Sequence, residues 1–172
     1  MHTATPKDLR AAGVQATDKP SLQIDDFSNG WQDWYLLSAG SPHHWEYSTR
    51  KINDPKWRGR DDYRLAFEVQ AEKPTELVIL LTENFFRSYR GKQRQFSAIV
   101  KLDGGEEAQT VTLTPDDFVS DSGEQLSSWA NVDLLSFRAY HDSGEKLLGS
   151  KSWSGSQPQF RQLRWTEPED RP

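Results

Sequence analysis

The apolar residues of this chain recur at every second position in short runs, and no stretch sustains the spacing of a helix. Within residues 63–70, Leu65, Phe67 and Val69 would share one buried face, because side chains alternate between the two faces of a strand. A continuous apolar run at 77–82 is typical of a strand that is covered on both faces. The spacing therefore predicts strands and excludes a helical bundle.

Runs of this kind repeat along most of the chain and predict about nine strands of roughly five to eight residues. Turn-forming residues separate them at 28–30, 53–55, 103–105, 122–123 and 143–144. The single helical candidate is one turn at 114–118, where Thr114 can cap and Pro115 suits the first helical position. Parallel strands would need helical crossovers for which there is no room. The predicted fold is all-β, an antiparallel β-sandwich.

The length of 172 residues fits one domain. Residues 1–20 show no sustained period and close with Lys19-Pro20, so we expect a disordered leader or linker there. The sandwich domain is predicted to span 21–166. The last residues, 167–172, are polar and contain prolines, and they are predicted to form a C-terminal tail.

Charge and cysteine content exclude several classes of function. The formal net charge is −5, whereas nucleic-acid-binding and anionic-membrane-binding surfaces usually carry a basic excess. No apolar run is long enough to span a membrane, and the first residues lack a signal-peptide pattern. With no cysteine, the chain can form no disulfide, zinc–thiolate site or cysteine nucleophile. We therefore expect neither nucleic acid nor a membrane as partner.

The apolar residues are unusually aromatic, with 7 Trp, 8 Phe and 5 Tyr in a hydrophobic total of 34%. Trp and Phe must then fill much of the core. Trp31, Trp34, Trp45 and Trp165 fall in strand-like runs and are predicted to be core. A ring that remains exposed after the core is filled becomes a candidate for function.

Two stretches carry a resemblance to a known superfamily. The first is Gln109-x-Val111-x-Leu113 leading into residues 114–118 (TPDDF), then Trp129-x-x-Val132-x-x-Leu135-x-Phe137. The second is residues 24–27 (IDDF) followed by Gly30-Trp31. These stretches resemble the galactose-binding-like jelly rolls that serve as non-catalytic carbohydrate-binding modules in secreted polysaccharide-degrading enzymes. They are also similar to the complex I intermediate-associated protein 30 domain.

This resemblance implies a jelly-roll sandwich in which Phe27, Phe118 and Trp129 are core residues. It implies an accessory domain that binds a poly- or oligosaccharide, beside an adjoining catalytic domain, in a secreted or periplasmic protein. Several members hold a structural calcium ion, for which Asp25, Asp26 and Glu167 could supply oxygens here. No run resembles a calcium-binding loop, so no cofactor is expected, and a structural calcium is left open.

Three loop segments mix aromatic with polar residues as a sugar site requires, because a flat ring can stack on the C–H face of a sugar while polar side chains bind its hydroxyls. They are residues 56–62, 84–90 and 151–157. The alternative for each is a ring folded onto the sandwich as a lid. The predicted ligand-binding residues are Trp57, Arg60, Phe86, Arg87, Tyr89, Arg90 and Trp153.

The segment 84–95 also gathers four cations, Arg87, Arg90, Lys92 and Arg94. One interpretation is a site for an anion or a uronic acid, since guanidinium groups bind carboxylates through paired hydrogen bonds. The favoured interpretation is a solvated cationic hairpin that discourages aggregation through a sheet edge.

The sequence gives little support for a catalytic function. The carboxylate doublets Asp25-Asp26, Asp61-Asp62 and Asp116-Asp117 would point to opposite faces of a strand, whereas glycoside hydrolysis needs two convergent carboxylates. His43-His44 has no third ligand at a suitable spacing. No G-x-S-x-G elbow or phosphate-binding glycine motif occurs. We therefore predict a non-catalytic carbohydrate-binding module, with a structural or protein-interaction domain as the alternative and a stand-alone hydrolase as a third hypothesis.

Overall fold

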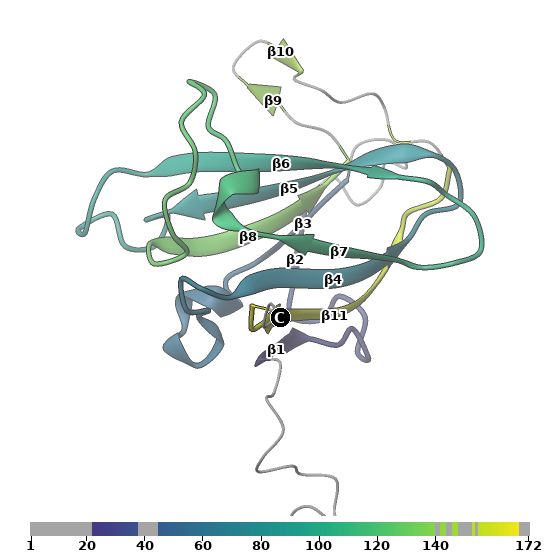
Figure 1. Ribbon diagram of the computed structural model, residues 1–172, viewed down its shortest axis with the longest axis horizontal. Helices are drawn as coiled ribbons and strands as arrows, with labels where there is room; N and C mark the ends of the chain where they lie inside the picture. Colours follow the sequence, from purple (N-terminus) through teal and green to yellow (C-terminus); the bar gives the residue numbers. More distant parts are fainter. Residues whose placement is uncertain are drawn as a thin grey trace, which may run out of the picture.

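The computed structural model describes residues 22–37, 45–139, 142–143, 146–147, 153 and 155–168, and Figure 1 shows its strands stacked in layers. The predicted leader 1–20, the pair His43-His44 and residues 169–172 of the predicted tail lie outside the described residues. The division into leader, sandwich domain and tail stays a prediction.

Two antiparallel sheets make up most of the described part of the chain, one in the order β1-β11-β4-β7 and the other in the order β2-β3-β8-β5-β6. The first sheet contains β1 (Leu22–Asp25), β4 (Arg64–Gln70), β7 (Gln109–Leu113) and β11 (Gln159–Thr166). The second contains β2 (Tyr35–Leu37), β3 (Glu46–Thr49), β5 (Thr75–Glu83), β6 (Arg94–Leu102) and β8 (Val132–Arg138). A small separate pair joins β9 (Asp142–Ser143) to β10 (Lys146–Leu147).

Helical structure in the described part of the chain is limited to three 3-10 turns, η1 (Lys51–Asn53), η2 (Pro55–Trp57) and η3 (Pro115–Asp117). The η3 turn occupies the place predicted for a single helical turn. The side chain of Asp117 closes this turn, because its Oδ2 accepts the backbone N–H of Thr114 at 2.8 Å. The predicted all-β antiparallel sandwich is confirmed.

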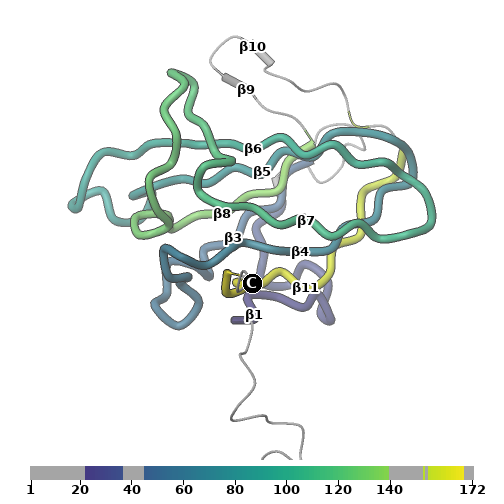
Figure 2. Tube along the Cα trace, in the orientation of Figure 1, coloured from purple at the N-terminus to yellow at the C-terminus, as the bar shows by residue number. Residues whose placement is uncertain are grey.

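The first and last strands of the domain lie side by side. β1 pairs with β11 so that Leu22 stands opposite Trp165, and Figure 2 shows the two ends of the coloured trace meeting there. This pairing adds β1 to the edge of the four-stranded sheet and joins segments that are far apart in the sequence.

Alternation along the strands places the core between the sheets. Leu65, Phe67 and Val69 of β4 are buried as the spacing predicts, while their neighbour Glu68 is only partly buried. β5 is buried on both faces, since Val78 and Leu80 are covered as well as the core-facing residues of the strand. The continuous apolar run therefore marks a strand in the interior of the five-stranded sheet, between β8 and β6.

Aromatic rings fill much of the core, as the composition predicts. Phe137 stacks on Phe160 at 4.3 Å between ring centroids and meets Phe67 edge-on at 5.0 Å. The predicted core residues Phe118 and Trp129 are buried, and Trp129 Nε1 donates to the carbonyl oxygen of Tyr63 at 2.9 Å. Phe27 is partly buried against the same cluster.

Among the described residues, no helix has both the length and the apolar character needed to cross a membrane.

Candidate functional site

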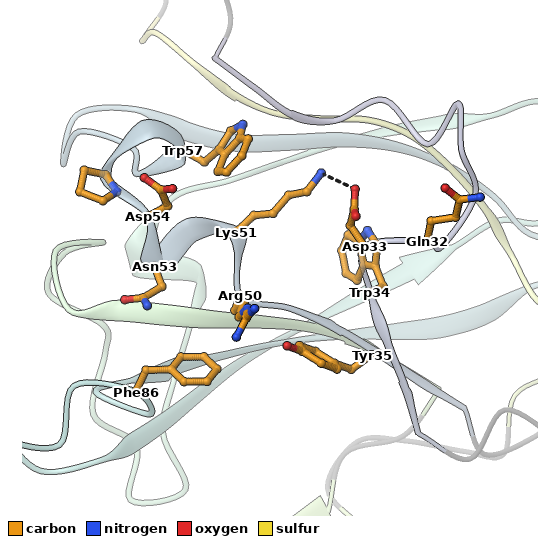
Figure 3. Close-up of a pocket in the computed structure, with 11 residues that line it drawn as sticks. Gln32, Asp33, Trp34, Tyr35, Arg50, Lys51, Asn53, Asp54, Trp57 and Phe86 are labelled. Carbon is orange, nitrogen blue, oxygen red and sulfur yellow. Dashed lines mark ion pairs between the residues drawn. The ribbon is translucent and has the colours of Figure 1, made fainter.

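An open groove of about 870 Å³ lies where the five-stranded sheet meets the segment that follows β3. Its walls come from the residues before and at the start of β2, from the η1–η2 segment and from the loop after β5. Figure 3 shows the side chains that line it. They are Gln32, Asp33, Trp34, Tyr35, Arg50, Lys51, Asn53, Asp54, Pro55, Trp57 and Phe86.

Three accessible aromatic rings face this groove from three separate segments. Tyr35 and Phe86 are 50% and 39% exposed, and Trp57 is partly buried. Figure 3 shows Trp57 on one side and Tyr35 and Phe86 on the other, with Arg50 and Lys51 between them. The groove therefore offers flat apolar surfaces around a charged and polar floor.

The backbone around Trp57 is held by specific bonds. Asp54 caps the η2 turn by accepting the N–H of Lys56 at 3.0 Å, and Pro55 occupies the first helical position. The carbonyl oxygen of Trp57 accepts the indole N–H of the core residue Trp165 at 2.7 Å. This bond fastens the turn that carries Trp57 to the edge of the core.

Gly59 lets the segment pass close to the core. A Cβ at this position would lie 2.4 Å from the ring of Trp165, which no real contact allows. The glycine therefore permits the close approach that brings the η2 turn to the groove.

Strand alternation places Tyr35, and a buried carboxylate places Phe86. Trp34 turns into the core, so its neighbour Tyr35 points outward. After β5, the chain turns at Asn84 with a φ of +56°, and the N–H groups of Phe85 and Phe86 then donate to Asp133 at 2.9 and 2.8 Å. Both rings thus have a fixed backbone.

The polar floor centres on Lys51. Its Nζ donates to the carbonyl oxygen of Ile24 at 3.2 Å and pairs with Asp25 at 3.5 Å and Asp33 at 3.6 Å. The same Nζ lies 5.6 Å from the centroid of Trp57. A cation thus stands beside an aromatic ring, a favourable arrangement that leaves polar donors next to an apolar face.

Two other cations flank the rings of the groove. The guanidinium carbon of Arg50 lies 6.0 Å from the Tyr35 centroid, and Lys56 Nζ lies 4.8 Å from the Trp57 centroid. Both side chains belong to exposed residues. A ligand can therefore displace either cation from its ring, because long exposed side chains adopt many rotamers.

Two of the three carboxylates proposed for calcium, Asp25 and Asp26, are engaged by protein donors. Asp25 accepts the N–H of Phe27 at 2.8 Å and the indole N–H of Trp34 at 2.7 Å. Asp26 accepts the N–H of Ser28 at 2.9 Å, and this hydrogen bond lowers the pKa of Asp26 below its ordinary value. No cluster of three metal-binding side chains occurs among the described residues.

The structure brings two of the seven predicted ligand-binding residues, Trp57 and Phe86, into this groove. Arg60 is exposed and forms a bidentate pair with Asp62 at 2.9 and 3.2 Å, outside the residues that line it. Tyr89 is 83% exposed and does not line the groove either. Arg90 is exposed, whereas Arg87 is buried.

The prediction of an exposed Trp153 is wrong. Its side chain is 1% exposed and meets Trp45 edge-on at 5.0 Å between centroids. Its indole N–H donates to the carbonyl oxygen of Ser156 at 2.8 Å, so the polar end of the ring is satisfied inside the protein. The Trp153 ring is folded onto the sandwich as a lid, which was the alternative for this loop.

Tyr35, Arg50 and Asn53 line the groove but were not predicted from the sequence as binding residues. Alternation contained a signal for Tyr35, since a predicted core Trp34 places its neighbour on the opposite face. Arg50 and Asn53 carry no comparable local signal, because the groove that they line forms only where β2, the segment after β3 and the loop after β5 meet.

The interpretation of segment 84–95 as a solvated cationic hairpin is wrong at Arg87. Arg94 does lie at the surface, where it pairs with Glu83 and Glu124, both at 2.9 Å. Arg87 is only 7% exposed, and its nearest charge partner is the buried Asp133 at 3.6 Å. One cation of this segment is therefore enclosed by the fold.

Comparisons with known proteins support the fold. No family model matches the chain, and no curated protein matches it. A solved structure of a family 11 carbohydrate-binding module from Clostridium thermocellum, in complex with a β-1,3-1,4-mixed-linked tetrasaccharide, is similar with a TM-score of 0.51 and 12% identity. The match covers 88% of this chain and 98% of that one. At this identity the likeness shows a shared β-sandwich fold.

Proposed function

We propose that this protein is a non-catalytic carbohydrate-binding domain and that its glycan lies in the groove between Tyr35, Trp57 and Phe86. The observation that carries the proposal is the convergence of three accessible rings, from three separate segments, on one open groove with a polar floor. Rings used only to fill a core would not be left facing the same opening.

The chemistry of the groove suits a sugar chain. Each ring offers a flat apolar face for the C–H side of a pyranose. Arg50, Asn53 and Gln32 add donors and acceptors that can reach hydroxyl groups between the rings. An open groove, in contrast to an enclosed pocket, accommodates a segment of a longer chain.

Fold similarity to a carbohydrate-binding module supports this proposal without identifying a ligand. The accessory role beside a catalytic domain, the secreted or periplasmic location and the kinship with complex I intermediate-associated protein 30 domains belong to the same proposal. Within the groove, Asp33 pairs with Lys51 and Asp54 caps a turn, so both carboxylates already have structural roles. This engagement favours binding over hydrolysis.

Isothermal titration with neutral gluco-, xylo-, manno- and galacto-oligosaccharides tests the proposal. We expect one of these series to bind, and Trp57→Ala to weaken that binding by about 10-fold or more, which corresponds to about 1.4 kcal/mol. Tyr89→Ala is the matched control, because it removes an exposed ring outside the groove and should leave the affinity unchanged. Equal affinity of wild type and Trp57→Ala would contradict the proposed site.

A protein-interaction role is the second candidate, favoured by the exposed rings of Phe85 and Tyr89 on the loop after β5. Exposed rings on one loop can anchor a partner protein. This candidate reverses the outcome above: Tyr89→Ala would abolish capture of a protein partner, and no oligosaccharide would bind at millimolar concentration.

A further inference from the structure

Arg87 is a buried cation whose hydrogen bonds are not made. It is 7% exposed, and none of its three guanidinium nitrogens has a hydrogen-bond partner among the described residues. Burying a guanidinium is costly unless its donors are satisfied. The position therefore calls for an acceptor that the described part of the chain does not supply.

Asp133 forms an ion pair with Arg87 but no hydrogen bond. Its carboxylate is fully buried and lies 3.6 Å from Arg87 Nε, beyond hydrogen-bond distance. Its two oxygens already accept the N–H groups of Phe85 and Phe86 at 2.9 and 2.8 Å. The main task of Asp133 is therefore to hold the loop that carries Phe86.

Two more arginines share this neighbourhood. Arg58 donates from Nη2 to the carbonyl oxygen of Asn53 at 2.6 Å, while its Nε is buried and has no hydrogen-bond partner among the described residues. Burial lowers the pKa of Arg58, and the positive charges of Arg87 and Arg90 lower it further. Arg87 and Arg90 therefore both lie close enough to Arg58 for their positive charges to act on it.

The negative charges nearby do not balance them. Asp133 and Asp54 are the two carboxylates whose charges act on Arg58, and both already accept backbone N–H groups. Arg94, in contrast, makes two short ion pairs at 2.9 Å in the same stretch of chain. The described residues therefore satisfy Arg94 and leave Arg58 and Arg87 with free donors.

The cluster adjoins the proposed groove. Asn53, which holds Arg58, and Phe86, which precedes Arg87, both line that groove. Arg90 is exposed and Arg58 is partly buried, so solvent reaches these two side chains, whereas the guanidinium nitrogens of Arg87 are covered. An anionic group on a glycan in the groove could therefore reach Arg58 and Arg90.

We propose that Arg58, Arg87 and Arg90 form an oxyanion subsite beside the groove and that the glycan is acidic. This inference rests on the proposed function, because it assigns the substrate class of the same site. The ligand group is a uronate carboxylate or a sulfate ester, since guanidinium nitrogens bind either through paired hydrogen bonds. The bound anion accepts from Arg90 and from the partly buried Arg58, and its negative charge offsets the repulsion that Arg87 and Arg90 exert on Arg58.

The experiment compares glycans that differ in one charged group. Oligogalacturonate is titrated against its methyl ester, and a sulfated galacto-oligosaccharide against its desulfated form, so that each arm tests one source of the anion. We expect one acidic form to bind about 10-fold or more tightly than its neutral counterpart. The arm that shows the preference identifies the group.

Variants at the accessible arginines locate the effect. Arg58→Gln and Arg90→Gln should each remove most of the preference for the acidic form. Arg94→Gln is the matched control, because it removes one positive charge from the same stretch where the cation already has two carboxylate partners. Arg87 is left intact, since a substitution of this buried residue could unfold the domain.

A second measurement uses inorganic sulfate and acetate as bare probes, followed by the NMR signals of the arginine Nε–H groups. Shifts at Arg58 and Arg87, absent in Arg90→Gln, support the subsite even if no glycan binds, in which case the proposed function alone fails. If neutral glycans bind as tightly as acidic ones and the probes shift no signal, the subsite is overturned while the groove proposal stands. An acidic preference that persists in both arginine variants also overturns it.

Discussion

Two groups of aromatic rings lie side by side in this molecule and differ in what surrounds them. Trp34 is 5% exposed and contacts other rings, with centroids 5.0 Å from Trp31 and 5.6 Å from Phe137. Its sequence neighbour Tyr35 is half exposed and has a guanidinium as its partner, with Arg50 6.0 Å from the ring centroid. The boundary between core and groove thus runs between adjacent residues.

This difference separates stability from binding. A ring packed on other rings cannot be uncovered without opening the core, so its contacts contribute to folding. A ring whose neighbour is a mobile cation can exchange that neighbour for a ligand at little cost. We call rings that pack on other rings in the core, such as Trp34 and Phe137, the sealed rings, and we expect substitutions there to lower stability. We call Tyr35, Trp57 and Phe86 the groove rings, and we expect substitutions there to lower glycan affinity.

The largest effect should come from Phe137→Ala among the sealed rings. Phe137 contacts Phe160 at 4.3 Å and Phe67 at 5.0 Å, and its removal leaves a cavity between the sheets. We expect the free energy of unfolding to fall by about 4 kcal/mol, as measured by urea denaturation. Phe85→Ala, at an exposed ring, is the control and should change stability by less than about 0.5 kcal/mol. If both variants lost a similar free energy of unfolding, the distinction between sealed and exposed rings would be wrong.

Trp153→Ala tests whether this ring belongs with the sealed rings. We expect a loss of about 3 kcal/mol, at the lower end for such a substitution, because the loop can partly collapse into the space. The folded variant should bind glycan as wild type does. A loss of affinity without loss of stability would instead return Trp153 to the binding residues predicted from the sequence.

Tyr35→Ala sharpens the comparison from the groove side. The ring is half exposed, so its removal should change the free energy of unfolding by less than about 0.5 kcal/mol. We expect glycan affinity to fall by about 5- to 10-fold, which calorimetry measures directly, because a stacking surface is lost. Tyr35→Phe, which keeps the ring and removes the hydroxyl, should retain most of the affinity. Weak binding by Tyr35→Phe would mean that the hydroxyl, and not the ring face, carries the contact.

The sequence was sufficient for the sandwich and for most of its core. Period-two spacing is a local property, so it predicts the shared face of Leu65, Phe67 and Val69 even when the partner strands are unknown. The 3-10 turn at 115–117 was equally local, since Thr114, Pro115 and Asp117 act within four residues.

The groove depended on contacts between distant segments and was predicted only in part. Trp57 and Trp153 both sit in loops among polar residues, yet one faces the groove and the other meets Trp45 in the core. Their sequences do not separate these fates, because the partner of Trp153 lies more than a hundred residues away. Arg87 was equally ambiguous, since its burial depends on Asp133 in a different strand.

The smallest predicted effect concerns the tether that keeps Trp153 sealed. Glu72 Oε2 accepts the hydroxyl of Ser156 at 2.8 Å and its N–H at 3.2 Å, and the carbonyl of the same Ser156 accepts the Trp153 indole N–H. The hydroxyl bond first, and the N–H bond second, lower the pKa of Glu72 below its ordinary value of 4.5. The tether therefore stabilises the fold above pH 4.5 and is lost as the pH falls through the lowered pKa.

Ser156→Ala removes the hydroxyl hydrogen bond, which has the larger effect on the pKa of Glu72. The pKa should therefore rise toward its ordinary value, as followed by carboxyl NMR titration. Asp26 provides the internal control, because its pKa is lowered by Ser28 and should stay low in the variant. The Trp153 ring should remain buried near neutral pH, since the N–H bond to Glu72 and the packing against Trp45 persist. An unchanged Glu72 titration in Ser156→Ala would contradict this prediction. The burial of Trp153 would then depend on packing alone, without a contribution from Glu72.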